Sequence, residues 1–167
     1  MTTFLSLRLP RLALSLSLAF SLAAVTTGAC AATPTFDADL LAIQTDWAKA
    51  NYQPSGAAKE AAFDVLAKQA AAFTGRNPGR AEPLIWEGIV LSTAAGVKGG
   101  LGALGLAKQS RARLEAALAI DPQALQGSAY TSLGTLYHKV PGFPIGFGSD
   151  KKAREYLDAF PDESWWL

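Results

Sequence analysis

The chain has 167 residues, half of them hydrophobic, and its 15 basic and 14 acidic side chains give a formal net charge of +1. A chain this close to neutrality has no electrostatic basis for binding nucleic acid or an acidic membrane surface. Its length suits a single domain with a substantial core.

Residues 1–25 have the three parts of a secretory signal peptide. Arg8 and Arg11 make the start positive, and residues 12–25 form an apolar stretch that is too short to span a bilayer comfortably. Small residues follow and give an A-x-A cleavage site that ends at Ala31. The pattern predicts export to the periplasm with cleavage after Ala31.

Cys30, the only cysteine, leaves other interpretations of the leader open. It could be the lipid-anchored cysteine of a lipoprotein, but Thr27 stands where a lipobox normally has a leucine-like residue. An uncleaved anchor is a third alternative. The favoured interpretation assigns residues 1–31 to a signal peptide and residues 32–167 to the mature domain. Cys30 is then discarded and the mature protein has no disulfide.

The mature sequence is rich in alanine and leucine, poor in β-branched runs and interrupted by glycine and proline, which is typical of a helical protein. Asp37 is the expected N-cap of the first helix, with Phe36 and Leu41 as a hydrophobic staple. We expect helices over residues 38–52, 56–73, 82–95, 101–120, 123–139 and 151–160. The predicted fold is all-α, a TPR-like (tetratricopeptide-like) helical repeat of about three antiparallel helix pairs.

Repeated spacings support this prediction. Positions i, i+4 and i+7 share one face of a helix, and a glycine among them lets a partner helix approach closely. An irregular helical bundle is the alternative. The expected repeat-packing residues are Leu84, Gly88 and Leu91, then Leu114 and Ala117, and finally Tyr130, Leu133, Gly134 and Tyr137.

The segment "GSAYTSLGTLYHKVPGFPIGFGSDKKAREYL" has a helix ending in a K-x-P-G loop, a glycine-rich turn and a K-A helix started by an acid. In this it resembles bacterial periplasmic TPR proteins of the TRAP-transporter T-component type, most clearly over residues 82–157. The resemblance implies an exported helical-repeat protein that binds partner proteins, alongside a solute-binding protein of a transporter.

Residues 100–105, "GLGALG", satisfy G-x-G-x-x-G, which marks a dinucleotide site only when it follows a β-strand. Here the motif follows an expected helix. We therefore expect Gly99 and Gly100 to break that helix, and Gly102 and Gly105 to allow close packing of the next one. No cofactor is expected.

Catalytic groups are scarce. His138 is the only histidine, and its place at the end of the fifth expected helix suits a surface or capping role. One histidine without a mature cysteine cannot assemble a zinc site or a cysteine–histidine pair. The glycines of "GFGSDKK" could expose backbone N–H groups to an anion, although a turn capped by Ser149 or Asp150 is the favoured interpretation. We expect a non-catalytic protein.

Aromatic residues are the better indication of function. Phe143, Ile145 and Phe147 alternate in the loop 141–148, which is stiffened by prolines, and could offer an apolar contact. Trp165 and Trp166 would be costly to expose, so they either fold back over the last helix pair or contact another molecule. These five residues are the candidate binding surface, together with the concave face of the repeat.

Two functions remain open at this stage. The first is a binding module of the cell envelope, whose partner is another envelope protein, a peptide or an apolar small molecule. The second is a structural or assembly factor that forms a homo-oligomer. Membrane association is expected only if Cys30 is lipidated.

Overall fold

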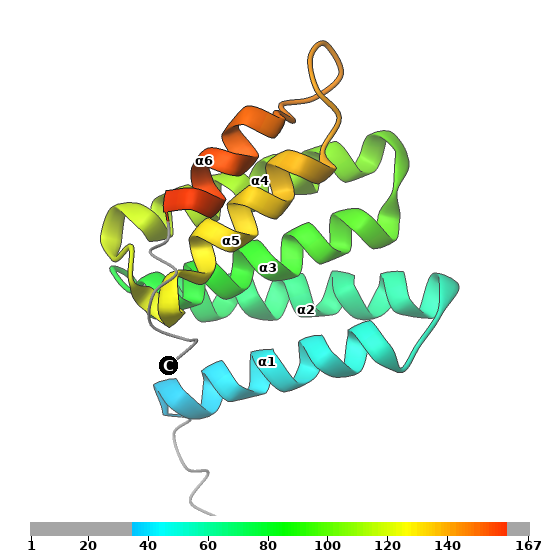
Figure 1. Ribbon diagram of the computed structural model, residues 1–167. Coiled ribbons are helices and arrows are strands. Elements are labelled where there is room, and N and C mark those ends of the chain that lie inside the picture. Colours follow the sequence, from blue (N-terminus) through cyan, green and yellow to red (C-terminus); the bar gives the residue numbers. More distant parts are fainter. Residues whose placement is uncertain (1–34, 160–167) are drawn as a thin grey trace, which may run out of the picture. The chain divides into compact units, whose positions relative to one another are not determined.

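The computed structural model describes residues 35–159 as six α-helices, with no strand in that range (Figure 1). The prediction of an all-α fold is confirmed. The predicted signal peptide, Cys30, Trp165 and Trp166 lie outside the described residues. The helices are α1 (Phe36–Tyr52), α2 (Gly56–Arg76), α3 (Ala81–Lys98), α4 (Gly100–Ile120), α5 (Ala124–Lys139) and α6 (Asp150–Ala159).

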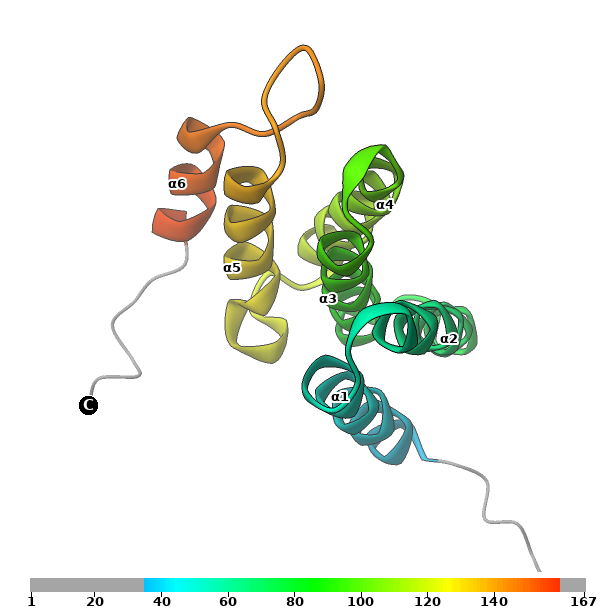
Figure 2. The same cartoon turned by 90° about the vertical axis from the view of Figure 1, so that its right-hand side faces the viewer.

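The six helices lie in two rows. Each helix packs against the next along the chain, and α3 also contacts both α1 and α5. In Figure 2, α5, α3 and α1 follow one another from left to lower right, with α6 to the left of α5, and with α4 and α2 above and to the right of α3 and α1. This arrangement fits a helical repeat. The side of α1, α3 and α5 that is turned away from the other three helices is called the inner face below.

The first helix starts earlier than predicted. Thr35, not Asp37, is the N-cap, because the Thr35 hydroxyl oxygen accepts a hydrogen bond from the backbone N–H of Ala38 at 3.3 Å. Phe36 is consequently in the first turn, where its ring packs 5.4 Å from that of Phe73 on α2. The capping prediction was wrong because both residues are good N-caps and the tertiary contact of Phe36 decides between them.

The turn between α3 and α4 depends on glycine. Gly99 and Gly100 have φ values of 63° and 60°, a left-handed conformation that side chains disfavour. The predicted helix break is confirmed. The prediction of close packing at Gly102 and Gly105 is wrong. A Cβ atom added at Gly105 meets nothing within 4 Å, and a Cβ atom added at Gly102 meets only the flexible side chain of Lys98.

Two main groups of buried residues form the core, and α3 contributes to both. One joins α1, α2 and α3 through residues such as Phe63 and Val90, and the other joins α3 to α6 around Leu114 and Leu133. Because α3 is covered on several sides, it is the most apolar of the six helices.

The same close contact occurs in two successive helix pairs. A Cβ added at Gly88 of α3 would lie 2.6 Å from Cγ of Leu114 on α4, and one added at Gly134 of α5 would lie 2.6 Å from Cγ of Leu157 on α6. Each helix pair therefore approaches at a position where only glycine fits. The buried hydroxyl of Ser110 adds a hydrogen bond of 2.7 Å to the carbonyl of Gly88.

The residues expected to pack between repeats are all buried except Tyr130, which is half-buried. The buried ones are Leu84, Gly88, Leu91, Leu114, Ala117, Leu133, Gly134 and Tyr137.

Candidate functional site

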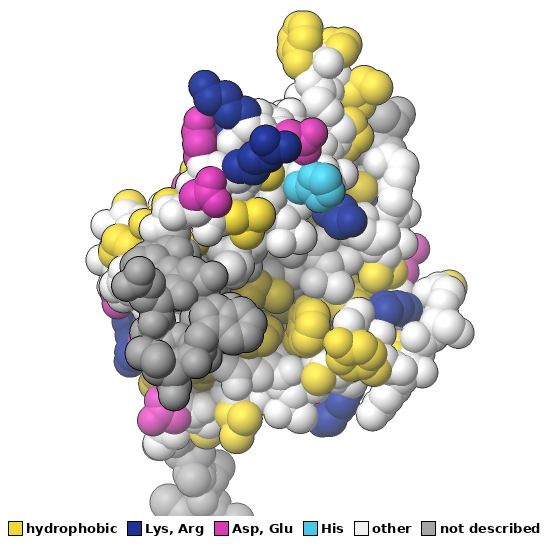
Figure 3. Space-filling model, viewed as in Figure 1, with side chains coloured by type: hydrophobic (Ala, Val, Ile, Leu, Met, Phe, Trp, Pro, Cys, Tyr) yellow, Lys and Arg dark blue, Asp and Glu magenta, His cyan; other side chains and the backbone are white. Residues whose placement is uncertain are grey.

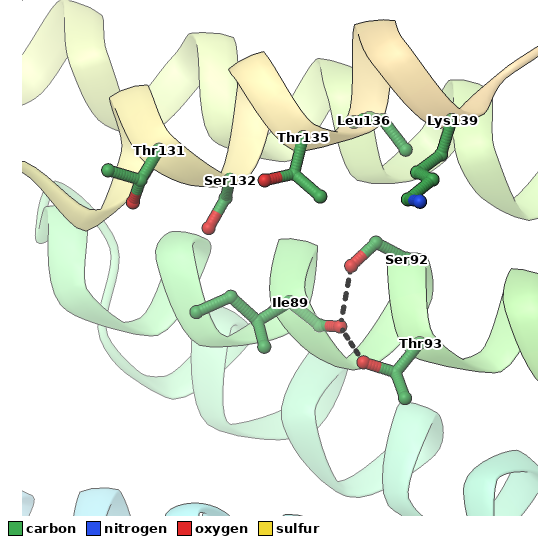
Figure 4. A pocket seen from close by; sticks show the side chains of 8 residues that line it. All are labelled: Ile89, Ser92, Thr93, Thr131, Ser132, Thr135, Leu136 and Lys139. Carbon is green, nitrogen blue, oxygen red and sulfur yellow. Dashed lines mark hydrogen bonds between the residues drawn. The ribbon is translucent and has the colours of Figure 1, made fainter. Parts of the chain in front are cut away.

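A groove with a volume of about 360 Å³ runs along the inner face between α3 and α5 (Figure 4). Figure 3 shows the same face, on which apolar side chains gather between α5 and α1 while charged side chains lie mainly around the border. The lining residues are Ile89, Ser92 and Thr93 of α3 and Thr131, Ser132, Thr135, Leu136 and Lys139 of α5.

Helical periodicity places these residues together. Ile89, Ser92 and Thr93 are three and four residues apart, and so occupy one face of α3. On α5, Ser132 and Lys139 are seven residues apart, which is two helical turns, so they lie on the same side of the helix. That side of α5 faces Ile89, Ser92 and Thr93 of α3 across the groove. The groove therefore has hydroxyl groups on both walls, with Ile89 and Leu136 as its apolar side chains.

Some of the hydroxyl groups are already engaged within their own helices. Ser92 and Thr93 both donate to the carbonyl oxygen of Ile89, at 2.8 and 2.9 Å, and Thr131 donates to the carbonyl oxygen of Ser128 at 3.1 Å. Such bonds satisfy the hydroxyl proton without a ligand.

Other polar groups of the groove have no such partner. Within residues 35–159, no hydrogen bond or ion pair engages the side chains of Ser132, Thr135 or Lys139. Figure 4 shows Ser132 and Thr135 directed from α5 toward α3, and Lys139 extending toward Ser92. The α5 wall can therefore donate and accept hydrogen bonds to a bound molecule.

Aromatic residues extend the inner face toward α1. The Trp47 indole N–H donates to the hydroxyl of Thr93 at 3.1 Å, and the Trp47 ring lies edge-on to Trp86 and Tyr52, each at 6.2 Å between centroids. Tyr52 is exposed. The buried indole N–H of Trp86 has no hydrogen-bond partner among the described residues.

The groups with shifted pKa values lie outside the groove. A hydrogen bond from Arg80 Nη2 at 2.8 Å holds the pKa of Glu82 below its usual value, and burial raises the pKa of Tyr156. His138 pairs with Asp150 at 3.0 Å between its Nδ1 and the carboxylate. No cluster of metal-ligating side chains occurs within the described residues.

The predicted binding residues of the loop between α5 and α6 differ in their exposure to solvent. Phe143 is 94% exposed and Ile145 is 64% exposed. Phe147 instead packs inward, with its ring edge-on to Tyr137 at 5.3 Å and the Arg111 guanidinium carbon 4.5 Å from its centroid. Phe147 is therefore placed to support the loop, whereas Phe143 and Ile145 are free to contact another molecule.

Backbone hydrogen bonds shape the same loop. The N–H of Gly148 donates to the carbonyl of Pro141 at 2.9 Å, and the N–H of Gly146 donates to that of Gly142 at 3.1 Å. A side chain at Gly148 would run into the backbone of Val140. These contacts fix the direction in which each side chain of the loop points.

Sequence reasoning did not single out Ser132, Thr135 or Lys139. A helical projection of α5 would have found them, because they occur at intervals of three and four residues on a side of the helix other than that of Gly134. The buried face was recognised from its apolar residues, and the polar side was left unassigned.

None of the helices within residues 35–159 is long and apolar enough to cross a bilayer. Comparisons of the chain with protein-family models, with curated proteins and with solved structures found no match.

Proposed function

We propose that the chain is a non-catalytic binding module of the bacterial cell envelope, which holds an extended segment of a partner protein in the groove between α3 and α5. The observation that carries the proposal is the row of polar side chains formed by Ser132, Thr135 and Lys139, which have no hydrogen-bond or ion-pair partner among the described residues and line the same groove as Ile89 and Leu136.

The spacing of these groups suits an extended peptide. Ser132 and Lys139 are seven residues apart on α5, which is about 10 Å along a helix axis. An extended chain covers that distance in about three residues. The hydroxyls of Ser132 and Thr135 would bond to peptide groups, which need partners when they leave water. Lys139 would pair with an acidic side chain or a terminal carboxylate.

The groove chemistry favours a peptide over a structured surface. Ile89 and Leu136 supply apolar contact between the polar positions, and Trp47 and Tyr52 continue the inner face beyond the groove. Aromatic groups provide large contact area at a low cost in side-chain entropy. A segment longer than the groove could therefore continue across α1.

The envelope location rests on the leader and on the family resemblance. Cleavage after Ala31 would release residues 32–167 into the periplasm. The resemblance of residues 82–157 to TRAP-transporter T-component proteins supports a partner linked to a solute transporter. The intact mass of the exported protein tests this point: an N-terminus at Ala32 is expected, and a diacylglyceryl-modified Cys30 would replace the soluble assignment by a lipoprotein.

Site-specific photo-crosslinking in cells tests the binding surface. A photoreactive amino acid at Thr135 should form an adduct with a different protein, whereas the same group at Gln109, an exposed residue of α4, should not. An adduct with a second copy of the chain would instead support the assembly-factor function. Equal adducts from the two positions would contradict the groove as the binding surface.

A further inference from the structure

A second cavity lies between the end of α3, the start of α4 and the loop that follows α5, with a volume of about 310 Å³. Its wall is mainly apolar and includes Ala95 of α3 and Ala103, Leu104 and Ala107 of α4. Three of these side chains are a single methyl group, and Ala95 and Ala107 are buried beside Leu136, so the cavity lies next to small side chains. The volume falls at the lower end of the range for small-molecule sites.

The loop forms the roof of this cavity. Ile145 lines the cavity although it is largely exposed to solvent, and Pro141 lies beside it. The hydrogen bond from Gly148 to Pro141 and the packing of Phe147 on Tyr137 hold the loop in place. An apolar ligand would therefore enter a site that already exists, with little loss of conformational entropy.

The chemistry of the cavity mouth is polar and positively charged. Ser92, Leu136 and Lys139 line both this cavity and the inner groove, so they mark the boundary between the two. Lys139 has no ion-pair partner within residues 35–159, whereas the nearby Lys98 is bound to Glu60 at 3.1 Å.

Other features of the cavity lining also favour an anion. No acidic side chain is among the described residues that line the cavity. The first residue of α4, Gly100, is part of the wall, and its N-cap Gly99 supplies no side-chain acceptor to the first turn. The positive end of the α4 dipole thus lies at the cavity wall with no capping side chain among the described residues, and it adds to the positive charge of Lys139 in favouring an anion.

We infer that this cavity binds a single-chain amphiphile with an anionic headgroup, of the fatty-acid type. The acyl chain lies among Ala103, Leu104, Ala107 and Ile145, and the carboxylate lies at the mouth, where it pairs with Lys139. This site goes beyond the proposed peptide groove, because it is an adjoining cavity, sharing only Ser92, Leu136 and Lys139 with the groove, and it requires no partner protein.

Isothermal titration calorimetry with the purified full chain tests the inference, with decanoate as the probe below the concentration at which it forms micelles. Gly96→Leu is the blocking variant. Gly96 lines the cavity, and a Cβ added there meets nothing within 4 Å, so leucine adds bulk at the cavity wall without a clash. Gly105→Leu is the matched control, since a Cβ there is equally unobstructed and Gly105 does not line the cavity.

Decanoate should bind the parent and the Gly105→Leu variant alike, and binding to Gly96→Leu should be lost. Lys139→Gln should weaken decanoate binding about tenfold through loss of the charge-assisted contact. Lys108→Gln, at an exposed α4 position that does not line the cavity, should change nothing. Decanol should bind the parent about as weakly as decanoate binds Lys139→Gln.

Three results would overturn the inference. The first is that the parent fails to bind decanoate. The second is that Gly96→Leu binds decanoate as tightly as Gly105→Leu does, which would place the ligand elsewhere. The third is that decylamine binds as tightly as decanoate, which would remove the role of positive charge at the mouth.

Discussion

Replacing Gly88 with alanine tests the closest helix contact of the core. The added Cβ would lie 2.6 Å from Cγ and 2.8 Å from Cδ2 of Leu114, distances that real Cβ atoms do not tolerate. Leu114 is 0% exposed and belongs to the core group that joins α3 to α6, so its side chain cannot rotate into solvent. The two helices would have to separate, or Leu114 would have to leave its preferred rotamer.

The expected magnitude follows from two opposing contributions. Overpacking of a well-filled core costs about 1–3 kcal/mol, and we expect the upper end of that range because Leu114 has no free space. Alanine in place of glycine within a helix returns about 1 kcal/mol. The net loss in the free energy of unfolding should be about 2 kcal/mol. Gly105→Ala, where the Cβ meets nothing within 4 Å, should instead gain about 0.5–1 kcal/mol.

Urea unfolding followed by far-ultraviolet circular dichroism measures both variants. A double-mutant cycle with Leu114→Ala isolates the contact, because that substitution vacates the space that the new Cβ needs. Leu114→Ala alone should cost about 2–5 kcal/mol, and adding Gly88→Ala to it should return up to about 1 kcal/mol of helix propensity instead of costing more. The reasoning would be refuted if Gly88→Ala and Gly105→Ala were equally stable. It would also be refuted if Gly88→Ala lowered the free energy of unfolding by the same amount in the Leu114→Ala background.

Further predictions concern the loop and the shifted pKa values. Phe147→Ser should clearly lower the melting temperature, because Phe147 packs on Tyr137. Phe143→Ser, at an exposed position, should change the free energy of unfolding by less than about 0.5 kcal/mol. Equal effects of the two substitutions in a thermal melt would contradict the inward packing of Phe147. Arg80→Gln should raise the pKa of Glu82 toward its ordinary value, and an unchanged carboxyl titration by NMR would show that the hydrogen bond is not its cause. Because burial raises the pKa of Tyr156, the folded state holds that proton more tightly, and stability from this group is lost as the pH rises past about 10. Tyr156→Phe should therefore lose less stability than the parent when thermal melts are repeated at increasing alkaline pH. The same dependence of the melting temperature on pH in both proteins would contradict the effect of burial.

The repeat packing could be predicted because it depends on local spacing. Gly88 and Gly134 each occur in a run of apolar residues with helical period, so the sequence indicates that their faces are buried. Gly102 and Gly105 have a similar spacing, but their surroundings do not reveal which side of α4 they occupy. In the structure that side is open, so the same residue type has no packing role there.

The loop could be predicted only in part. Alternation of Phe143, Ile145 and Phe147 suggests one shared face, because successive side chains alternate in an extended chain. The hydrogen bonds of Gly146 and Gly148 turn the backbone instead, and Phe147 is rotated toward Tyr137. Such turns depend on contacts between segments, which a local pattern does not contain.

The groove could not be predicted because it belongs to two helices that are not adjacent in sequence. Which face of α3 lies opposite Ser132 and Thr135 depends on the rotation of each helix in the row. Hydroxyl residues also give a weak pattern, since they are common both on helix surfaces and in contact with their own backbone.

The most direct test of the groove is the affinity of the partner captured at Thr135 for a chain that carries Ser132→Ala, Thr135→Val and Lys139→Gln together. Loss of two neutral hydrogen bonds and one charged contact should raise the dissociation constant about a hundredfold. The matched control is Lys108→Gln with Gln109→Ala on α4, which should bind like the parent. A dissociation constant for the groove variant equal to that of the control would contradict binding between α3 and α5.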